Sequence, residues 1–568
     1  MLSVYSRFVS SLVVFLLCLS ASPLNAEEEM ANPAPQPRAR RVDVVLIGAT
    51  SSLAKKYLFQ SFFRSYLEEE LKPGGPARDF HFYGGATRPV EEGRQLLSDI
   101  LAFSTSCKGV QDVDLAVCEE KLSVFRKSFQ YVQLRGEDHY KQLGRRLERE
   151  GAETGKPLEG RLFYLSISPD LYAGIAQYVG DYLRPIGARD AEAPWVRVVV
   201  EKPFGRDLAS AEALAAALGQ HLAEEELYRV DHYMGKGVVQ AILPFRRANR
   251  GWLEALWTGR HVGAVEVSMK ETEDCQGRTS FYEGYGVIRD VLQNHLTQVL
   301  VLLKMDIPPD KESTSSPSLG SHHHRTAVLR ELVLGGETEG GESRASIHVG
   351  QYQGYLDHVA SDRRSEPRVV RTSVPTAASV TLASRHPRWG GVSFTLKAGK
   401  ALDERTSYAR VVLCDGVPEG AAKAGCACEL LFNIQGGKFG TAIAWNRTAC
   451  TGMIEPAAVV TPPGWLSVEN EGESGLAADW QVLRPTAGEN APNAYDMVVA
   501  AVLSGDRSMF LDTEELLHQW RVWDNVLSKA DTMEPELYPK GFALDEVELS
   551  GVIGSISEEN EDSPHIEL

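Results

Sequence analysis

The sequence predicts two domains: an α/β domain on a parallel sheet, then an α+β domain with a large, mostly antiparallel sheet. Residues 42–47 form an almost unbroken apolar run, which is typical of a strand buried on both faces of a parallel sheet. Beyond residue 260 apolar residues alternate with polar ones, which indicates strands with one buried face. The 568 residues are enough for two domains with separate cores.

A glycine turn follows the first strand. Residues 48–57 read GATSSLAKKY and open a helix whose apolar face holds Leu58, Phe59, Phe62, Phe63 and Tyr66. A strand, a glycine turn and a helix N-terminus form the phosphate-binding half of a Rossmann-like dinucleotide fold, because a helix N-terminus attracts anions. We therefore expect the coenzyme contacts in this turn.

The second strand, residues 80–83, leads into Gly84-Gly85-Ala86-Thr87-Arg88. It ends without the acidic residue that would bind a ribose 2′-hydroxyl. Arg88 could instead contact a 2′-phosphate, which favours NADP over NAD. The alternative is that Arg88 is a solvated surface charge.

Two further apolar runs, residues 162–167 and 195–200, predict strands of the same sheet. The second ends in EKPFG, which places Lys202 just past the carboxyl end of a parallel strand, where such sheets bind ligands. Pro203 disfavours a helix at Lys202, and the bond between them can be cis. Asp207 is then expected to cap an Ala/Leu-rich helix.

The stretch RVDHYMGK, residues 229–236, follows that helix. His232, Tyr233 and Lys236 can donate to phosphate oxygens, and Asp231 can accept from a hydroxyl or orient a neighbouring side chain. Such a cluster suits an anionic ligand with several hydroxyl groups; the alternative is a plain polar turn. We place the domain boundary here, with domains at residues 42–229 and 230–545.

In the second domain, Val265, Val267 and Met269 alternate with polar residues, which predicts a half-buried strand. Similar patterns recur at residues 380–382, 392–396 and 411–413, and helices are expected at 287–303 and 513–530. Three histidines, residues 322–324, follow a Ser/Pro-rich stretch; a solvated loop is favoured over a metal site.

Residues 288–296 read IRDVLQNHL. His295 is the natural general base, because imidazole titrates near neutral pH; the alternative is a buried structural histidine. Asp290 lies five residues earlier, a spacing that does not bring two side chains face to face on a regular helix. Lys400 and Arg405, in GKALDER, add two cations after a predicted strand.

The charge balance and the two ends of the chain bear on its location. The net charge of −18 disfavours nucleic acids and anionic membrane surfaces as partners. Residues 1–26 resemble a secretory signal peptide, residues 27–41 a flexible leader, and residues 546–568 an acidic tail whose ending HIEL resembles an endoplasmic-reticulum retrieval signal. Nothing after the signal is long and apolar enough to span a membrane.

Seven cysteines remain after the predicted signal peptide. We expect a disulfide between Cys107 and Cys118, at least one free thiol, and no metal site at Cys426-Ala-Cys428. Asn446-Arg447-Thr448 is a glycosylation sequon, which is compatible with a lumenal protein.

These motifs together resemble one enzyme family. EKPFG, RVDHYMGK, IRDVLQNHL and GKALDER occur in the order and approximate spacing of glucose-6-phosphate dehydrogenase, over nearly all of residues 42–538. RTSFYEGYGVIRDVLQNHLTQVL and AGKALDER resemble most the branch in the lumen of the endoplasmic reticulum, hexose-6-phosphate dehydrogenase. That branch is the dehydrogenase part of a bifunctional protein that also carries a 6-phosphogluconolactonase; too little chain follows residue 538 here for us to expect the lactonase.

The resemblance implies specific roles. His295 would take the proton from the C1 hydroxyl, and Asp290 would orient or stabilise His295 and contact the sugar. The 6-phosphate would be held by His232 and Tyr233 with Lys400 and Arg405 nearby, and the sugar hydroxyls by Lys202, Lys236 and Glu271. The coenzyme, NADP with NAD as a possibility, would contact Gly48, Ala49, Thr50, Ser51, Ser52, Leu53, Ala54, Lys55, Arg88, Tyr164 and Lys202. Relatives are dimers or tetramers, so a homodimer or homotetramer is expected.

The turn departs from the family pattern GAxGDLAKK. Ser51 replaces a glycine, so its Cβ could clash with the pyrophosphate or require an awkward backbone angle, and Ser52 replaces an acidic residue. Ser52 could still cap the helix. Thr87 stands where the cytosolic branch has Arg, which leaves the choice between NADP and NAD open. The alternative function is a non-catalytic sugar-phosphate-binding protein with impaired coenzyme binding.

Overall fold

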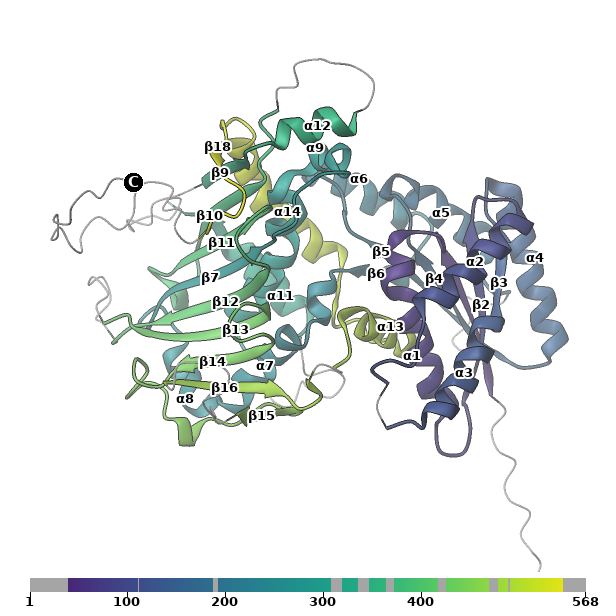
Figure 1. Ribbon diagram of the computed structural model, residues 1–568, viewed down its shortest axis with the longest axis horizontal. Coiled ribbons are helices and arrows are strands. Elements are labelled where there is room, and N and C mark those ends of the chain that lie inside the picture. The colour runs from purple at the N-terminus through teal and green to yellow at the C-terminus, as the bar shows by residue number, and fades with distance from the viewer. Residues whose placement is uncertain are drawn as a thin grey trace, which may run out of the picture. The chain divides into compact units, whose positions relative to one another are not determined.

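The computed structural model describes residues 39–110, 112–186, 193–307, 319–335, 347–363, 372–416, 425–468, 479–488 and 491–544. The predicted signal peptide, nearly all of the predicted leader and the predicted acidic tail lie outside these residues. Figure 1 shows two sheets, one formed mainly by the N-terminal part of the chain and the other by the later part.

The first sheet has seven strands in the order β17-β6-β5-β4-β1-β2-β3, all parallel to their neighbours except β17. The strands are β1 (Arg40–Ile47), β2 (Arg78–Ala86), β3 (Phe129–Gln133), β4 (Leu158–Leu165), β5 (Trp195–Glu201), β6 (Leu227–Val230) and β17 (Phe510–Leu511). All four predicted strands are present, although β1 begins inside the predicted leader. The Rossmann-like prediction is confirmed.

The segments between these strands are helical. They comprise η1 (Ala54–Leu58), α1 (Phe59–Glu70), α2 (Val90–Ser104), α3 (Leu115–Ser128), α4 (Glu137–Thr154), η2 (Pro169–Leu171), α5 (Tyr172–Tyr178), η3 (Val179–Leu183), α6 (Leu208–Gly219) and η4 (Glu224–Glu226). The predicted apolar face from Leu58 to Tyr66 is buried. Asp207 caps α6 by accepting from Ser210 N, and the Lys202-Pro203 bond is cis.

Strand β1 carries one charge within its apolar run. Asp43 is fully buried and accepts from Arg41 Nε at 2.6 Å and from Arg161 Nε at 3.0 Å. Both arginines are buried as well, so this carboxylate balances two desolvated cations.

Replacing Asp43 by Ala should therefore destabilise the protein strongly. It leaves Arg41 without a carboxylate partner and leaves Arg161 with only Glu148, which is partly exposed. The expected loss in the free energy of unfolding is about 3–5 kcal/mol, measured by urea denaturation. The exposed Asp99→Ala is the control and should change it by less than about 0.5 kcal/mol; an equally small change for Asp43→Ala would contradict the assignment.

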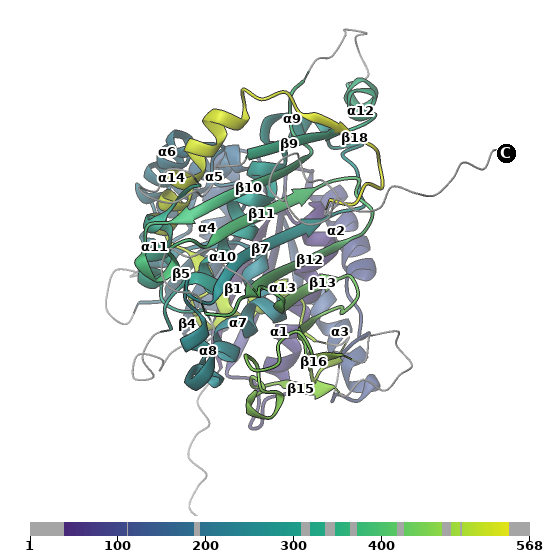
Figure 2. The same cartoon turned by 90° about the vertical axis from the view of Figure 1, so that its left-hand side faces the viewer.

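The second sheet has eleven strands in the order β15-β16-β14-β13-β12-β7-β11-β10-β9-β18, with β8 paired to β10. Only the pairs β7–β11 and β9–β18 are parallel among its described pairings, so the predicted mostly antiparallel sheet is confirmed. Figure 2 shows β9 to β13 side by side. The strands are β7 (Val262–Lys270), β8 (Leu332–Leu334), β9 (Ile347–Tyr352), β10 (Ala377–Ser384), β11 (Ser393–Gly399), β12 (Thr406–Leu413), β13 (Cys428–Gly436), β14 (Ala442–Asn446), β15 (Trp465–Val468), β16 (Trp480–Pro485) and β18 (Glu536–Tyr538).

Helices accompany this sheet and connect it to the first domain. They are η5 (His232–Gly235), α7 (Gly237–Ala248), α8 (Arg250–Leu256), α9 (Thr279–Val287), η6 (Ile288–Leu296), α10 (Thr297–Lys304), α11 (His322–Glu331), α12 (Tyr355–Asp362), η8 (Pro387–Trp389), η9 (Pro456–Ala458), α13 (Ala494–Ser504) and α14 (Thr513–Ala530). Helix α13 packs on α1 and η5, so a late segment of the chain returns to the N-terminal domain. No described helix is both long and apolar enough to cross a membrane.

The predicted half-buried strand is wrong for β7. Its polar residues Glu266, Ser268 and Lys270 are buried too. The reason is that β7 lies inside the sheet and its charges are paired. Glu266 lies 3.0 Å from Lys397 Nζ and 3.1 Å from Arg410.

The histidines at 322–324 do not form a solvated loop. They open α11, where His322 Nδ1 lies 3.2 Å from Glu515 Oε2. Both oxygens of Glu515 also accept from buried Arg325, at 3.0 Å each, so the carboxylate is already balanced by a guanidinium.

Six of the cysteines are paired. The predicted disulfide Cys107–Cys118 is present, together with Cys414–Cys426 and Cys428–Cys450. Cys275 is buried and carries the expected free thiol. Cys426 and Cys428 therefore each belong to a different disulfide.

Candidate active site

His295 and Asp231 form a buried pair at the centre of the site. His295 Nδ1 lies 2.5 Å from Asp231 Oδ1, and the side chains are only 2% and 3% exposed. Asp231 follows β6 and caps η5 by accepting from Tyr233 N at 3.0 Å, so its position is fixed by the backbone. A carboxylate bonded to Nδ1 fixes the imidazole tautomer and leaves Nε2 to accept a proton. The pair therefore has the geometry of a general base.

Asp290 is not the hydrogen-bond partner of His295. Because η6 is π-helical, its hydrogen bonds connect residues five apart, which brings Asp290 near His295 as an α-helix would not. Its carboxylate, however, pairs with Lys202 Nζ at 3.1 Å and lies 3.9 Å from Lys400 Nζ. Of the predicted roles of Asp290, orienting His295 belongs to Asp231, whereas the charge of Asp290 does stabilise the protonated imidazole by raising the pKa of His295.

Two lysines and two carboxylates alternate beside this pair. Lys400, after β11, bonds to Glu271, after β7. Lys202, after β5, also donates to Asp290 O at 2.7 Å. These strand ends and η6 thus bring together the predicted sugar-contacting groups. Ammonium donors and carboxylate acceptors in alternation suit a polyhydroxylated ligand.

His232 and Tyr233 pack directly on the base. The Tyr233 ring stacks on His295 with centroids 4.5 Å apart and an interplanar angle of 17°. Its hydroxyl contacts Met269 Sδ at 3.2 Å. The His232 ring meets His295 edge-on at 4.6 Å and lies nearly parallel to Tyr495 at 5.8 Å. The four aromatic rings hold one another in place.

Of the two cations predicted near the phosphate, Lys400 is bonded to Glu271 among the sugar-contacting groups. Arg405 instead lies close enough to Lys236, which was predicted to bind the sugar hydroxyls, to affect its pKa. Lys236 is the residue before α7, and its Nζ donates to Gln435 Oε1 at 2.9 Å. Arg405 pairs with Glu273 at 3.0 Å and is 63% exposed, so it is free to move. Burial lowers the pKa of Lys236, and the charge of Arg405 lowers it further. Two cations that repel each other in this way favour an anion between them.

The ionisation states suit base catalysis. Burial lowers the pKa of His295, and Asp231 offsets only part of that effect, so the imidazole is neutral at neutral pH. Burial opposes ionisation of Asp231, but the charge and hydrogen bond of His295 outweigh it and lower the pKa of this carboxyl. Burial also lowers the pKa of His232. Lys202 and Lys400 overcome the burial of Asp290 and hold its pKa well below the usual range.

The glycine turn approaches the next strand closely. Gly48 has φ +89°, and a Cβ there would lie 2.2 Å from Ser166 O, so glycine is required. None of the described residues accepts from the backbone N–H groups of Thr50, Ser52 or Leu53. These donors, at the start of a helix, fit the phosphates of a dinucleotide.

Ser51 does not cause the predicted strain. It is not among the described residues with positive φ, and its Oγ accepts from Ala54 N at 3.1 Å and lies 2.6 Å from Ser166 Oγ. The hydroxyl that caps the helix is therefore that of Ser51, not Ser52 as predicted. The awkward backbone angle, one of the two reasons for expecting impaired coenzyme binding, is therefore absent.

The other two predicted coenzyme residues lie in different environments. Arg88 is half-exposed and pairs with Glu92 one helical turn later, so it stays accessible to a 2′-phosphate. Tyr164 is fully buried, and its hydroxyl donates to Glu201 Oε1 at 2.6 Å. None of its surface is exposed, and the coenzyme contact of Tyr164 stays a prediction.

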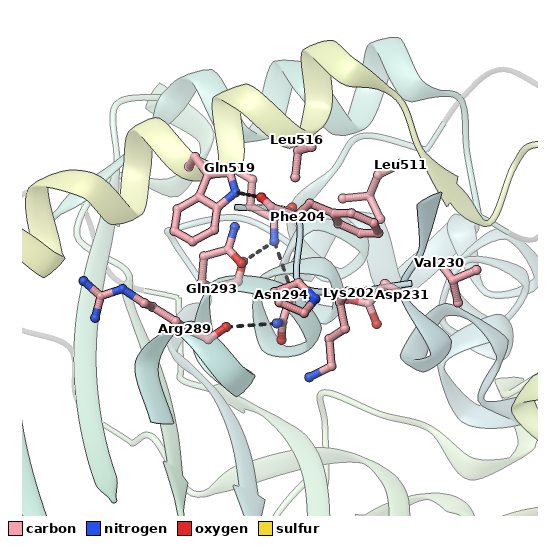
Figure 3. A pocket seen from close by; sticks show the side chains of 12 residues that line it. Lys202, Phe204, Val230, Asp231, Arg289, Gln293, Asn294, Leu511, Leu516 and Gln519 are labelled. Atoms are coloured by element: carbon pink, nitrogen blue, oxygen red, sulfur yellow. Dashed lines mark hydrogen bonds between the residues drawn. The ribbon is translucent and has the colours of Figure 1, made fainter. Parts of the chain in front are cut away.

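A narrow pocket of about 10 Å³, partly open to solvent, has Lys202 and Asp231 in its lining. Figure 3 shows it between Lys202, Gln293 and Asn294 on one side and Leu511, Leu516 and Gln519 on the other. Trp520 Nε1 donates to Phe204 O at 2.9 Å, and Gln519 bonds to the backbone of Gln293. Helix α14 thus braces both η6 and the segment that carries Lys202.

The sequence left the partner of Asp231 and the roles of two other residues unpredicted. Asp231 was recognised as part of a polar cluster, but nothing in the sequence paired it with a histidine 64 positions later. Gln435 belongs to no motif, and Glu201 opens the EKPFG motif but was given no role. Glu201 directly precedes Lys202, and burial raises its pKa to about 7.

A coenzyme turn, a buried imidazole–carboxylate pair and a cation-rich ligand site are together typical of NAD(P)-dependent oxidoreductases. Residues 45–241 match the model "Glucose-6-phosphate dehydrogenase, NAD binding domain", and residues 243–447 match "Glucose-6-phosphate dehydrogenase, C-terminal domain". The chain belongs to the glucose-6-phosphate dehydrogenase family.

Relatives support this assignment. The chain is 38% identical to the human GDH/6PGL endoplasmic bifunctional protein over 515 residues, 88% of this chain and 61% of that protein. It is 36% identical to the rabbit protein of that name, covering 94% of this chain and 63% of the relative. The chain thus spans less than two thirds of these relatives. A solved glucose-6-phosphate dehydrogenase in complex with glucose 6-phosphate matches 90% of this chain and 96% of its own at 25% identity, with a TM-score of 0.67.

Proposed function

We propose that the protein oxidises glucose 6-phosphate, or a related hexose 6-phosphate, at C1 and reduces NADP to NADPH. The observation that carries the proposal is the buried His295–Asp231 pair beside two lysines and a cation-rich anion site. Nε2 of His295 takes the proton from the C1 hydroxyl while the C1 hydrogen leaves with its electron pair. NADP, held by the glycine turn at residues 48–55, would supply the nicotinamide that takes up this hydride. The sugar product is the 6-phospho-1,5-lactone, as in the first step of the oxidative pentose phosphate pathway.

The remaining side chains bind and orient the sugar phosphate. His232, Tyr233, Lys236 and Arg405 receive the 6-phosphate, and Lys202, Asp290, Glu271 and Lys400 receive the hydroxyl groups. Asp231 keeps His295 in the tautomer that can accept the proton. Positioning of this kind supplies a large part of catalysis, because the reacting groups no longer have to find each other.

The test is the initial rate of NADPH formation from purified protein with glucose 6-phosphate, repeated with NAD in place of NADP. A rate that depends on the sugar phosphate supports the proposal. Absence of reduction with either coenzyme at millimolar substrate would contradict it. Under the alternative of a non-catalytic binding protein, calorimetry would show sugar-phosphate binding without NADP binding.

Lys236→Gln should weaken substrate binding. A charge-assisted bond to phosphate contributes about 1.5–3 kcal/mol, so KM for glucose 6-phosphate should rise by about 10- to 100-fold with a smaller change in kcat. Steady-state kinetics measures both. Lys127→Gln, on the exposed surface of α3, is the charge-matched control. An unchanged KM for Lys236→Gln would remove this residue from the phosphate site.

We also propose that the protein acts in the lumen of the endoplasmic reticulum. The support is the three disulfides, the endoplasmic relatives, and the predicted signal and HIEL ending. The sequon at Asn446 lies where β14 ends in an exposed turn, which suits glycosylation. In secretory cells, endoglycosidase treatment should increase the mobility of the wild type but not of Asn446→Gln, and deletion of residues 565–568 should send the protein into the medium. Retention of the deleted form would argue against the HIEL retrieval signal.

A homodimer or homotetramer remains a prediction, which light scattering would test.

A further inference from the structure

The coenzyme turn contains one side chain that the proposed reaction does not use. Ser51 Oγ accepts from Ala54 N at 3.1 Å and lies 2.6 Å from Ser166 Oγ. Because the Ala54 N–H occupies one of its lone pairs, Ser51 can give its own hydrogen to Ser166. Its hydroxyl thus joins the start of the helix to the neighbouring strand.

Ser166 is a rigid anchor for this bond. It follows β4, is only 6% exposed, and donates its N–H to Ile47 O at the end of β1, at 2.8 Å. Its carbonyl lies so close to Gly48 that no side chain fits between them. The position of Ser166 Oγ is therefore set by the sheet.

Apart from this bond, few described hydrogen bonds connect the turn to the sheet. Gly48 N and Ala49 N both donate to Gly85 O, which fixes the first two residues to β2. Ser51 N donates to Gly48 O at 2.9 Å, a bond within the turn itself. The Ser51–Ser166 bond is the described side-chain contact that ties the far half of the turn to the sheet.

We propose that Ser51 and Ser166 form a latch that holds the coenzyme turn in one conformation before the coenzyme binds. Ser51 is then a positioning residue that sets coenzyme affinity. The inference rests on the proposed function, since it takes this turn as the phosphate site. A turn ordered in advance loses less conformational entropy on binding, so affinity is higher. In place of a glycine that would be free to move, this chain has a hydroxyl with a fixed partner.

The test is a double-mutant cycle on NADP affinity. Ser51→Ala and Ser166→Ala each remove one side of the latch, and calorimetry measures the dissociation constant of NADP for the otherwise intact protein. Each single variant should bind NADP about five-fold more weakly, as expected for one net hydrogen bond. The double variant should be no weaker than Ser51→Ala, because the Ser51–Ser166 bond can be lost only once.

Two further readouts separate a latch from general damage. In the coenzyme-free protein, the amides of residues 50–54 should exchange hydrogen faster in both single variants, while the dissociation constant for glucose 6-phosphate stays the same. Thr395→Val, which removes a hydroxyl pair with Thr381 on the second sheet, is the control and should leave NADP affinity unchanged. If an alanine variant folds poorly, Ser51→Gly can replace it, and it should also weaken NADP binding.

Three results would each contradict the latch. The first is that NADP affinity and amide exchange stay unchanged in the variants. The second is additive losses in the double variant, and the third is tighter NADP binding by Ser51→Ala or Ser51→Gly. Activity and NADP binding of the wild-type protein test the proposed function independently of the latch. If it oxidises glucose 6-phosphate while the variants bind NADP equally well, only the latch fails. If the wild type neither binds NADP nor turns over, the proposed function fails first.

Discussion

Replacing His295 by Asn is expected to lower kcat for glucose 6-phosphate oxidation by about 10²- to 10⁴-fold, the usual contribution of a general base. The imidazole is buried, bonded through Nδ1 to Asp231 and neutral at neutral pH, so Nε2 is the group available to accept the C1 hydroxyl proton. Asparagine is of similar size and polar, but it cannot take up a proton in this pH range. Steady-state kinetics at saturating NADP measures the loss.

Calorimetry supplies the control for this variant. Because the phosphate and hydroxyl ligands are unchanged, the dissociation constant for glucose 6-phosphate should stay within a few-fold of the wild type. If kcat fell by less than ten-fold, His295 would not be the base. If binding were lost together with rate, the change would report a collapsed site.

Asp231→Asn should have the second-largest effect and a distinct pH signature. The carboxylate fixes the tautomer of His295 and stabilises the imidazolium formed during the reaction, so kcat should fall by about 10²- to 10⁴-fold. Asp231 also raises the pKa of His295 against the effect of burial, which lowers it. Removing the anion makes protonation harder. The acid limb of kcat/KM, which burial of His295 already lowers, should therefore move to still lower pH.

Asp290→Asn is the matched comparison. Asp290 bonds to Lys202 and not to His295, so its loss should raise KM for the sugar phosphate and move the acid limb less than Asp231→Asn does. If the two variants shifted the pH profile equally, the assignment of Asp231 as the orienting carboxylate would be wrong.

The fold was predictable because its signals are local. An apolar run marks a buried parallel strand, and alternation marks an antiparallel one, so β1 and β12 could be placed from the sequence. The alternation rule failed for β7, because its polar residues are buried as well. Glu266 reads as solvent-facing, and only the pairing of distant strands brings Lys397 and Arg410 against it.

The residues of the site could be predicted from the sequence, but many of the contacts between them could not. His295 and Lys202 could be named from their motifs, but the partner of His295 depends on β6 and η6 meeting in space. The π-helical geometry of η6 also escaped prediction, because the five-residue spacing was judged against a regular helix. Ser51 appeared strained only because its partner Ser166 lies 115 positions later.

The central claim is that His295 removes a proton from the C1 hydroxyl as the C1 hydrogen passes to the coenzyme. It is tested most directly with glucose 6-phosphate deuterated at C1 and unlabelled NADP, followed by mass spectrometry of the NADPH. The account predicts that wild-type protein forms NADPH one mass unit heavier, and that His295→Asn forms almost none in the same time. Unlabelled NADPH, or no NADPH from the wild type, would contradict it.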